Sequence, residues 1–180
     1  MEWNFFDPST DDDLKLPDKK GVYLVCVRDI NCLPNFMKDL TYCNIENNKV
    51  IYVGISKSKR GLRSRDYHHH FEGNNAGQST LRKSLGVLIY PGCEKIDRNK
   101  NCKRSQYKFA MCIETKLTTW MKKNLILYYR VVDNPSDDEI ELIKEYSPPL
   151  NINKNYSEIN LEFRKYLRKL RKNCCKRDRT

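Results

Sequence analysis

The chain has 180 residues, the usual size of one domain, and its 39% hydrophobic residues can supply a packed core, which excludes wholesale disorder. No apolar run approaches the roughly 20 residues of a membrane-spanning helix, so the sequence excludes an integral membrane protein. The net charge of +11 favours polyanionic partners. Nucleic acid comes first among them, RNA or a ribosome second, and an anionic membrane surface third.

The eight cysteines form no C-x-x-C pair and lie far from short zinc-ligand spacings. They predict free thiols in a reducing compartment, with a zinc site at Cys93 and Cys102 as the minor alternative. The acidic residues 1–13 lack the basic and apolar segments of a secretory signal. We therefore expect a cytoplasmic protein, which associates with the nucleoid when it acts on DNA.

Three runs rich in β-branched and aromatic residues predict strands, over 21–27, 49–55 and 125–132. The polar stretch 29–48, rich in Asn, predicts a long hairpin loop between the first two. Helices are expected over 62–71, 79–88 and 115–123, from Asn134-Pro135 to before Pro148, and over about 158–173.

This order of elements predicts an α+β fold: a small central antiparallel or mixed three-stranded sheet flanked by helices, with an added basic C-terminal helix. We expect an acidic N-terminal lead-in over 1–17, a central domain over 18–155, and a basic amphipathic helix and tail over 156–180.

The C-terminal helix has two faces. Its apolar stripe consists of Ile159, Phe163, Tyr166, Leu167 and Leu170, and cations cover the rest. Residues 157–180 hold nine Lys or Arg and three Asp or Glu. A solvated helix face and a phosphate-binding surface both fit this pattern. We favour phosphate contact because the charge has one sign.

The helix after Pro135 places a carboxylate among apolar residues. At about 100° per residue, Glu139 falls in the middle of the stripe of Leu142, Ile143 and Tyr146. A carboxylate on a buried face is costly unless it is paired, hydrogen-bonded or bound to metal. The alternative is a capping box with Ser136. The pattern alone leaves both open.

Cations are dense after the second strand, at Lys57, Lys59, Arg60, Arg63 and Arg65, and the histidines 68–70 follow. Arg65 and His69 are spaced i, i+4 and share one helix face. Arginine can hold a phosphate with two hydrogen bonds, and histidine can exchange protons. A basic surface helix with an incidental histidine run is the alternative, and the segment alone favours it.

Five elements in order resemble the GIY-YIG nuclease superfamily. They are Gly21-Val22-Tyr23, Tyr52-Val53-Gly54, a helix with Arg65, Glu139 followed by Leu142-Ile143, and Pro149-Leu150-Asn151. The resemblance covers 21–151, and the stretches 79–85 and 117–121 are similar to a bacterial branch. One departure is that 28 residues separate Tyr23 from Tyr52, where many members have about ten. We interpret the extra length as a longer hairpin loop.

The resemblance implies phosphodiester hydrolysis with one divalent metal, Mg²⁺ or Mn²⁺, held by Glu139. It also implies that Arg65 holds the scissile phosphate, that Tyr23 acts as or orients the base, and that Tyr52 positions water or phosphate. His69 would relay a proton and Asn151 would brace the site by hydrogen bonds. Gly21 and Gly54 would be required for tight packing or for room near the substrate.

We therefore expect a metal-dependent endonuclease that cuts DNA, of restriction or repair type, acting as a monomer or homodimer without a membrane. A catalytically inactive DNA- or RNA-binding module on the same fold is the alternative, and RNA is the alternative substrate. The residues expected to contact nucleic acid are Lys57, Lys59, Arg60, Arg63, Arg82, Lys83, Arg164, Arg168, Arg171 and Lys172.

Overall fold

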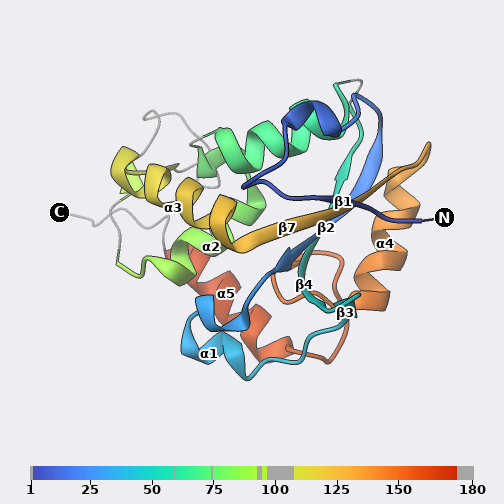
Figure 1. Ribbon diagram of the computed structural model, residues 1–180. Coiled ribbons are helices and arrows are strands. Elements are labelled where there is room, and N and C mark those ends of the chain that lie inside the picture. Colours follow the sequence, from blue (N-terminus) through green and yellow to red (C-terminus); the bar gives the residue numbers. More distant parts are fainter. Residues whose placement is uncertain (1, 59, 74, 93–94, 97–107, 174–180) are drawn as a thin grey trace.

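The computed structural model describes residues 2–58, 60–73, 75–92, 95–96 and 108–173 (Figure 1). The strands are β1 (Asn4–Phe6), β2 (Gly21–Val27), β3 (Asn44–Ile45), β4 (Asn48–Ser56), β5 (Lys95–Ile96), β6 (Lys108–Phe109) and β7 (Leu125–Val131). The α-helices are α1 (Asn35–Lys38), α2 (Thr80–Ile89), α3 (Met111–Asn124), α4 (Pro135–Tyr146) and α5 (Leu161–Asn173). The short 3-10 helices are η1 (Asp13–Lys15), η2 (Ile30–Cys32) and η4 (Ala76–Gln78), and η3 (Leu62–Glu72) is a π-helix.

The main sheet is antiparallel and has five strands in the order β1-β7-β2-β4-β3, while β5 and β6 form a separate pair. The α+β class is confirmed, but the expected three-stranded sheet is wrong. The three predicted strands form its centre, and β1 and β3 extend its edges. These edge strands are three and two residues long, too short to show an alternating pattern.

The central strand β2 is buried along its whole length, so its alternate side chains enter two different cores. Tyr23, Val25 and Val27 point to a core that η3, α2, α3 and α5 help to form. Val22, Leu24 and Cys26 point to the opposite face, where α4 packs with Leu142, Ile143 and Tyr146. Figure 1 shows α4 on one side of the sheet and α2, α3 and α5 on the other.

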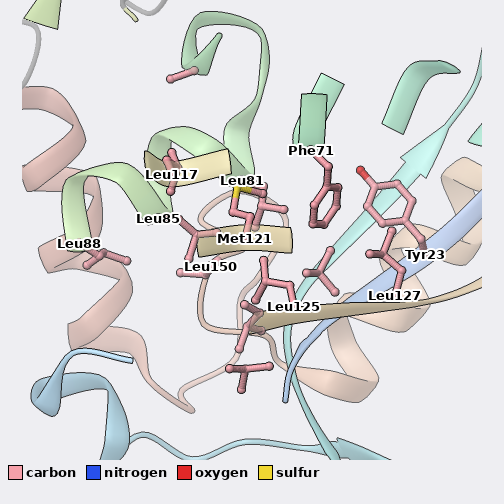
Figure 2. Close-up of a cluster of buried hydrophobic side chains, with 14 of the residues drawn as sticks. Tyr23, Phe71, Leu81, Leu85, Leu88, Leu117, Met121, Leu125, Leu127 and Leu150 are labelled. Atoms are coloured by element: carbon pink, nitrogen blue, oxygen red, sulfur yellow. The ribbon is translucent and has the colours of Figure 1, made fainter. Parts of the chain in front are cut away.

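The larger core ends at Tyr23. Figure 2 shows this tyrosine at one end of the cluster, beside Phe71 and Leu127, with the leucines of α2 and α3 farther along. The Tyr23 ring is therefore fixed by apolar contacts while its hydroxyl reaches the edge of the core. Close packing of the larger core thus holds the Tyr23 hydroxyl at a fixed position.

Helix η3 is a π-helix of 11 residues. Its buried apolar side chains are Leu62, Tyr67 and Phe71, at spacings of five and four residues. These spacings fit a helix with i→i+5 hydrogen bonds, in which each turn contains more residues than in an α-helix. The helix expected over 62–71 is therefore present, but its faces differ from those that a 3.6-residue period assigns.

Helix α4 does not use the expected capping box. Pro135 occupies the first turn, Asn134 is the N-cap residue, and no side chain caps the helix. Because proline is well suited to the first helical position, the helix starts before Ser136, which then lies too far inside it to cap it. The capping explanation for Glu139 is therefore wrong.

Helix α5 is packed into the larger core through Phe163 and Leu167, and it contacts α2. It begins at Leu161, so Ile159 of the expected stripe precedes it. The stretch 29–48 connects the antiparallel neighbours β2 and β4 and contains η2, α1 and β3. Within the described parts of the chain, no helix has the length and apolar character needed to cross a bilayer.

Candidate active site

Tyr23 lies across from Gly54 in the β2–β4 ladder. A Cβ atom on Gly54 would be 2.2 Å from the Tyr23 hydroxyl oxygen and from ring atom Cζ, so the ring occupies the space of the missing side chain. A Cβ atom on Gly21 would be 2.4 Å from the carbonyl oxygen of Arg130. Both glycines thus serve close packing, and Gly54 lets the Tyr23 ring lie against β4.

The Tyr23 hydroxyl is hydrogen-bonded to His70. The distance from Tyr23 Oη to His70 Nε2 is 2.7 Å, and the other ring nitrogen of His70, Nδ1, is 2.6 Å from Oγ of Ser79. Ser79 is the N-cap residue of α2, where its Oγ accepts a hydrogen bond from the backbone N–H of Arg82. A hydrogen-bonded chain therefore runs from the start of α2 through His70 to Tyr23.

A buried ion pair supports this chain from behind. Arg82 and Glu114 are almost fully buried, and Arg82 Nη2 lies 2.7 Å from Glu114 Oε2. Arg82 Nη1 also donates to the backbone oxygen of His70, at 2.8 Å. The remaining Arg82 donors bond to Glu114 and Thr118, so the guanidinium is satisfied. Because both charges are paired and hydrogen-bonded, the pair can hold the His70 backbone in place.

The three consecutive histidines have three different surroundings. His68 Nε2 is 2.7 Å from Asp13 Oδ2, and this hydrogen bond lowers the pKa of the Asp13 carboxyl. His69 lines a cavity, and His70 is buried against Tyr23 beside the same cavity. Only the last two are therefore placed for chemistry there.

Glu139 approaches the same cavity from α4. Its side chain is 16% exposed, and Oε2 lies 2.5 Å from Nζ of Lys154, an exposed lysine. Lys154 has a φ of +62°, in the left-handed region that non-glycine residues rarely adopt. Glu141, two residues along α4, is exposed, as the helical projection predicted.

These groups surround a cavity of about 140 Å³. Its lining residues are Tyr23, Tyr52, Ile55, His69, His70, Gln78, Thr80 and Glu139. We call Tyr23 and His70, together with Ser79 that is hydrogen-bonded to His70, the buried wall. Glu139, together with its partner Lys154, is the open wall. The Tyr52 ring also lines the cavity, with its centroid 6.4 Å from that of Tyr23 and 6.3 Å from that of His70.

Asn151 connects the chain after α4 to the strand beneath the cavity. Its Oδ1 accepts from the backbone N–H of Val53 at 2.8 Å, and its Nδ2 donates to the Val53 oxygen at 2.9 Å. The Leu150 N–H also donates to the oxygen of Ile51. Asn151 thus binds β4 as a strand would, next to Tyr52.

The structure brings together Tyr23, Tyr52, His69 and Glu139 among the predicted site residues, with Asn151 beneath them. Arg65 belongs to η3, but its side chain lies outside the described set. Sequence reasoning missed His70, Ser79, Glu114 and Lys154. The capping signal at Ser79 was visible, whereas the π-helical turn that presents His70 was not.

Several expected nucleic-acid contacts prove to be internal. Arg82 and Lys83 are buried, and Arg164 donates to the backbone oxygens of Ser157 and Ile159. For Arg82 and Arg164 the prediction of a surface contact is wrong, because their guanidinium groups satisfy buried carbonyl and carboxylate oxygens. Lys83 is 8% exposed, which leaves little of it for a partner.

The other expected contacts are more accessible. Lys57, Arg60 and Lys172 are exposed, and Arg171 is half-buried. Arg63 is paired with Asp18, and Arg168 donates one hydrogen bond to the backbone oxygen of Ile152. Lys59 lies outside the described residues, as do Cys93 and Cys102 of the alternative zinc site.

No group of three or more His, Cys, Asp or Glu that could hold a metal occurs among the described residues. Glu139 is the carboxylate that lines the cavity. The ammonium of Lys154 shows that this carboxylate already pairs with a cation. A hard divalent cation with water ligands needs one or two such carboxylates, so the donor set fits Mg²⁺ or Mn²⁺.

An antiparallel sheet flanked by helices, with two tyrosines, two histidines and a carboxylate around one cavity, defines an α+β protein with a polar cavity. A family model described as the GIY-YIG catalytic domain matches residues 21–173. The chain belongs to this nuclease family, and the match includes α5. The comparisons with curated proteins and with solved structures returned no match.

Proposed function

We propose that this protein is an endonuclease that hydrolyses DNA phosphodiester bonds with one divalent metal ion. The observation that carries the proposal is the cavity itself. Within a nuclease family, it gathers Tyr23, Tyr52, His70 and Glu139 at positions fixed by two strands and two helices. Tyr23 on the buried wall suits proton transfer, and the carboxylate on the open wall suits a cation.

The proposed metal ligand is Glu139, with Mg²⁺ or Mn²⁺ as the cation. When bound, the metal would supply positive charge at the scissile phosphate and at the leaving oxygen. Lys154 must give up its contact with Glu139 Oε2 to make room. Its exposed position allows this movement at little cost, because exposed ion pairs contribute about 1 kcal/mol or less.

The proton transfer is assigned to Tyr23. In its phenolate form, the Tyr23 oxygen accepts a proton from a water in the cavity as the water oxygen bonds to phosphorus. The bond from phosphorus to the leaving oxygen breaks, and the leaving oxygen takes up a proton from solvent water. Tyr52 orients the water or a phosphate oxygen, and His69 relays protons from the cavity. Arg65 is proposed to hold the scissile phosphate, and Asn151 keeps β4 in place beneath Tyr52.

Cations from two segments extend the proposed contact with DNA. Lys57, Lys59 and Arg60 follow β4 directly, and Arg168, Arg171 and Lys172 lie on α5. A compact enzyme that carries its own recognition surface would resemble a restriction or repair enzyme. Cutting both strands would then require two copies or two encounters, and a homodimer satisfies the first.

The experiment is cleavage of plasmid DNA by the wild type with Mg²⁺ or Mn²⁺ and with EDTA. Glu139→Ala is expected to lower cleavage by at least a hundredfold while DNA binding and folding persist, because the metal ligand is lost. Glu141→Ala is the matched control on the exposed face of α4 and should cleave normally.

Equal loss in both variants would contradict the placement of Glu139. If the folded wild type cuts no supercoiled, single-stranded or branched DNA, RNA is the next substrate. If RNA also stays intact, the protein is a binding module on a nuclease fold.

A further inference from the structure

His70 can act on Tyr23 in two opposite ways. A neutral imidazole carries one proton, on either Nδ1 or Nε2. If Nε2 is bare, His70 accepts the proton of Tyr23. If Nε2 carries the proton, His70 donates a hydrogen bond to the Tyr23 oxygen, and the tyrosine proton must point elsewhere. The distance of 2.7 Å fits both, so the answer depends on Nδ1.

The group at Nδ1 is the hydroxyl of Ser79, which is fully buried. Its oxygen already accepts the Arg82 N–H at the start of α2. The hydroxyl proton of Ser79 then needs an acceptor, because a buried donor left without a partner is costly. Among the described residues, the acceptor within hydrogen-bond distance is Nδ1 of His70.

The other neutral tautomer, with the proton on Nδ1, leaves the Ser79 hydroxyl proton unsatisfied. If Nδ1–H donated to the serine, Oγ would accept two hydrogen bonds and its own proton would have no acceptor among the described residues. The doubly protonated imidazolium meets the same conflict. The neighbouring buried charges of Arg82 and Glu114 already neutralise each other, so they offer no counter-ion to an imidazolium.

We infer that Ser79 donates its hydroxyl proton to Nδ1 of His70, so that neutral His70 carries its proton on Nε2 and donates it to the oxygen of Tyr23. Ser79 is therefore a positioning residue that selects the tautomer. The backbone of His70 is held by Arg82 Nη1, so the ring presents this N–H at a fixed place. The Tyr23 proton is then directed away from His70.

The consequence for catalysis rests on the proposed function. An N–H aimed at the tyrosine oxygen stabilises the phenolate over the phenol. Tyr23 thus exchanges its proton with the cavity, while His70 stays neutral and acts only as a hydrogen-bond donor. His70 then does not pass protons to or from Tyr23 during the reaction.

Nitrogen-15 NMR of histidine-labelled protein tests the tautomer directly. The chain has three histidines, so His68→Gln and His69→Gln variants assign the His70 resonances. We expect a proton bonded to Nε2 and a bare Nδ1. A proton on Nδ1, alone or together with one on Nε2, would overturn the inference. This measurement needs no substrate.

Two variants at position 79 test the role of the serine. Ser79→Thr keeps the hydroxyl and the helix cap, and it should retain the wild-type tautomer. Ser79→Asp keeps a cap acceptor but can only accept from His70, so it should move the proton to Nδ1 and lower the cleavage rate at least tenfold. An unchanged tautomer in folded Ser79→Asp would contradict the role of Ser79.

The two proposals fail separately. A wild type that never cleaves nucleic acid contradicts the proposed function, and the NMR experiment still decides the tautomer. A wild type that cleaves but carries its proton on Nδ1 contradicts the tautomer alone. Should Ser79→Asp not fold, the spectrum of the wild type remains decisive.

Discussion

The two walls of the cavity differ in how their polar groups are held. On the buried wall, His70 and Ser79 lie within a network that ends in the Arg82–Glu114 ion pair. On the open wall, the ion pair of Glu139 within the described parts of the chain is to Lys154, whose side chain is exposed. The comparison indicates that His70 and Ser79 are held by several buried partners, whereas the partner of the Glu139 carboxylate is an exposed lysine. Under the proposed function, the buried wall would stay fixed while a metal ion replaced Lys154 at Glu139.

The largest expected effect comes from the ion pair behind the buried wall. Glu114→Ala leaves the Arg82 charge buried without its partner, and it also removes the acceptor of the Ala76 and Phe109 N–H groups. We expect a loss of about 3–5 kcal/mol in the free energy of unfolding, measured by urea denaturation.

Glu162→Ala is the control, because it breaks an exposed pair with Lys165. We expect a change of about 0.5 kcal/mol or less. Equal effects from the two variants would mean that the buried network does not stabilise this wall.

The second effect concerns the fit between Gly54 and Tyr23. Gly54→Ala places a methyl group inside the Tyr23 ring, and we expect a loss of about 1–3 kcal/mol in stability, measured in urea. The displaced hydroxyl should also lower cleavage by tenfold or more, up to about a hundredfold. In a Tyr23→Leu background the same substitution should cost less, because the ring is gone. The same cost in both backgrounds would show that the tyrosine is not the group that excludes a side chain at position 54.

The third effect tests the exchange of cations on the open wall. Lys154→Met removes the ammonium that competes for Glu139 but keeps a long side chain. An exposed ion pair contributes up to about 1 kcal/mol, so Mn²⁺ should bind up to about fivefold more tightly, as titrations without DNA would show. Lys165→Met is the control and should bind Mn²⁺ like the wild type. Weaker binding in Lys154→Met would show that this lysine supports the metal rather than competing with it.

The smallest effect concerns the exposed cations of α5. Removal of the whole helix would expose the larger core, because Phe163 and Leu167 are buried in it. Neutralising Lys169 and Lys172 with Gln instead should reduce the slope of log affinity against log salt by about 0.9 per lost phosphate contact. Lys116→Gln and Lys123→Gln on α3 form the control pair. If only the control pair alters the slope, the DNA-binding surface lies over α3 rather than α5.

Much of the framework could be predicted from the sequence, because it depends on local patterns. The alternating and β-branched runs predicted β2, β4 and β7, and Pro135 predicted the start of α4. The apolar stripe of α4 set the orientation of Glu139. The paired glycine and tyrosine motifs predicted the family, which the match over 21–173 confirms.

The edge strands of the sheet and the buried polar network could be identified only from the tertiary structure. The strand β1 is recognisable only by its pairing with β7, more than 100 residues away along the chain. Arg82 looks like a surface cation in the sequence, and it is buried because Glu114 lies opposite on α3. Buried ion pairs of this kind form between helices that are separated in the sequence, so no local sequence pattern predicts them.

The sequence by itself determined the three central strands, the family and the face of α4 that carries Glu139. Only the tertiary structure decided which histidine meets Tyr23, since the wide turn of η3 brings His70 to the hydroxyl while a 3.6-residue period favoured His69. The same holds for Lys154, which reaches Glu139 through a left-handed turn. Helix pitch and long-range packing set these contacts, and both depend on the whole folded chain.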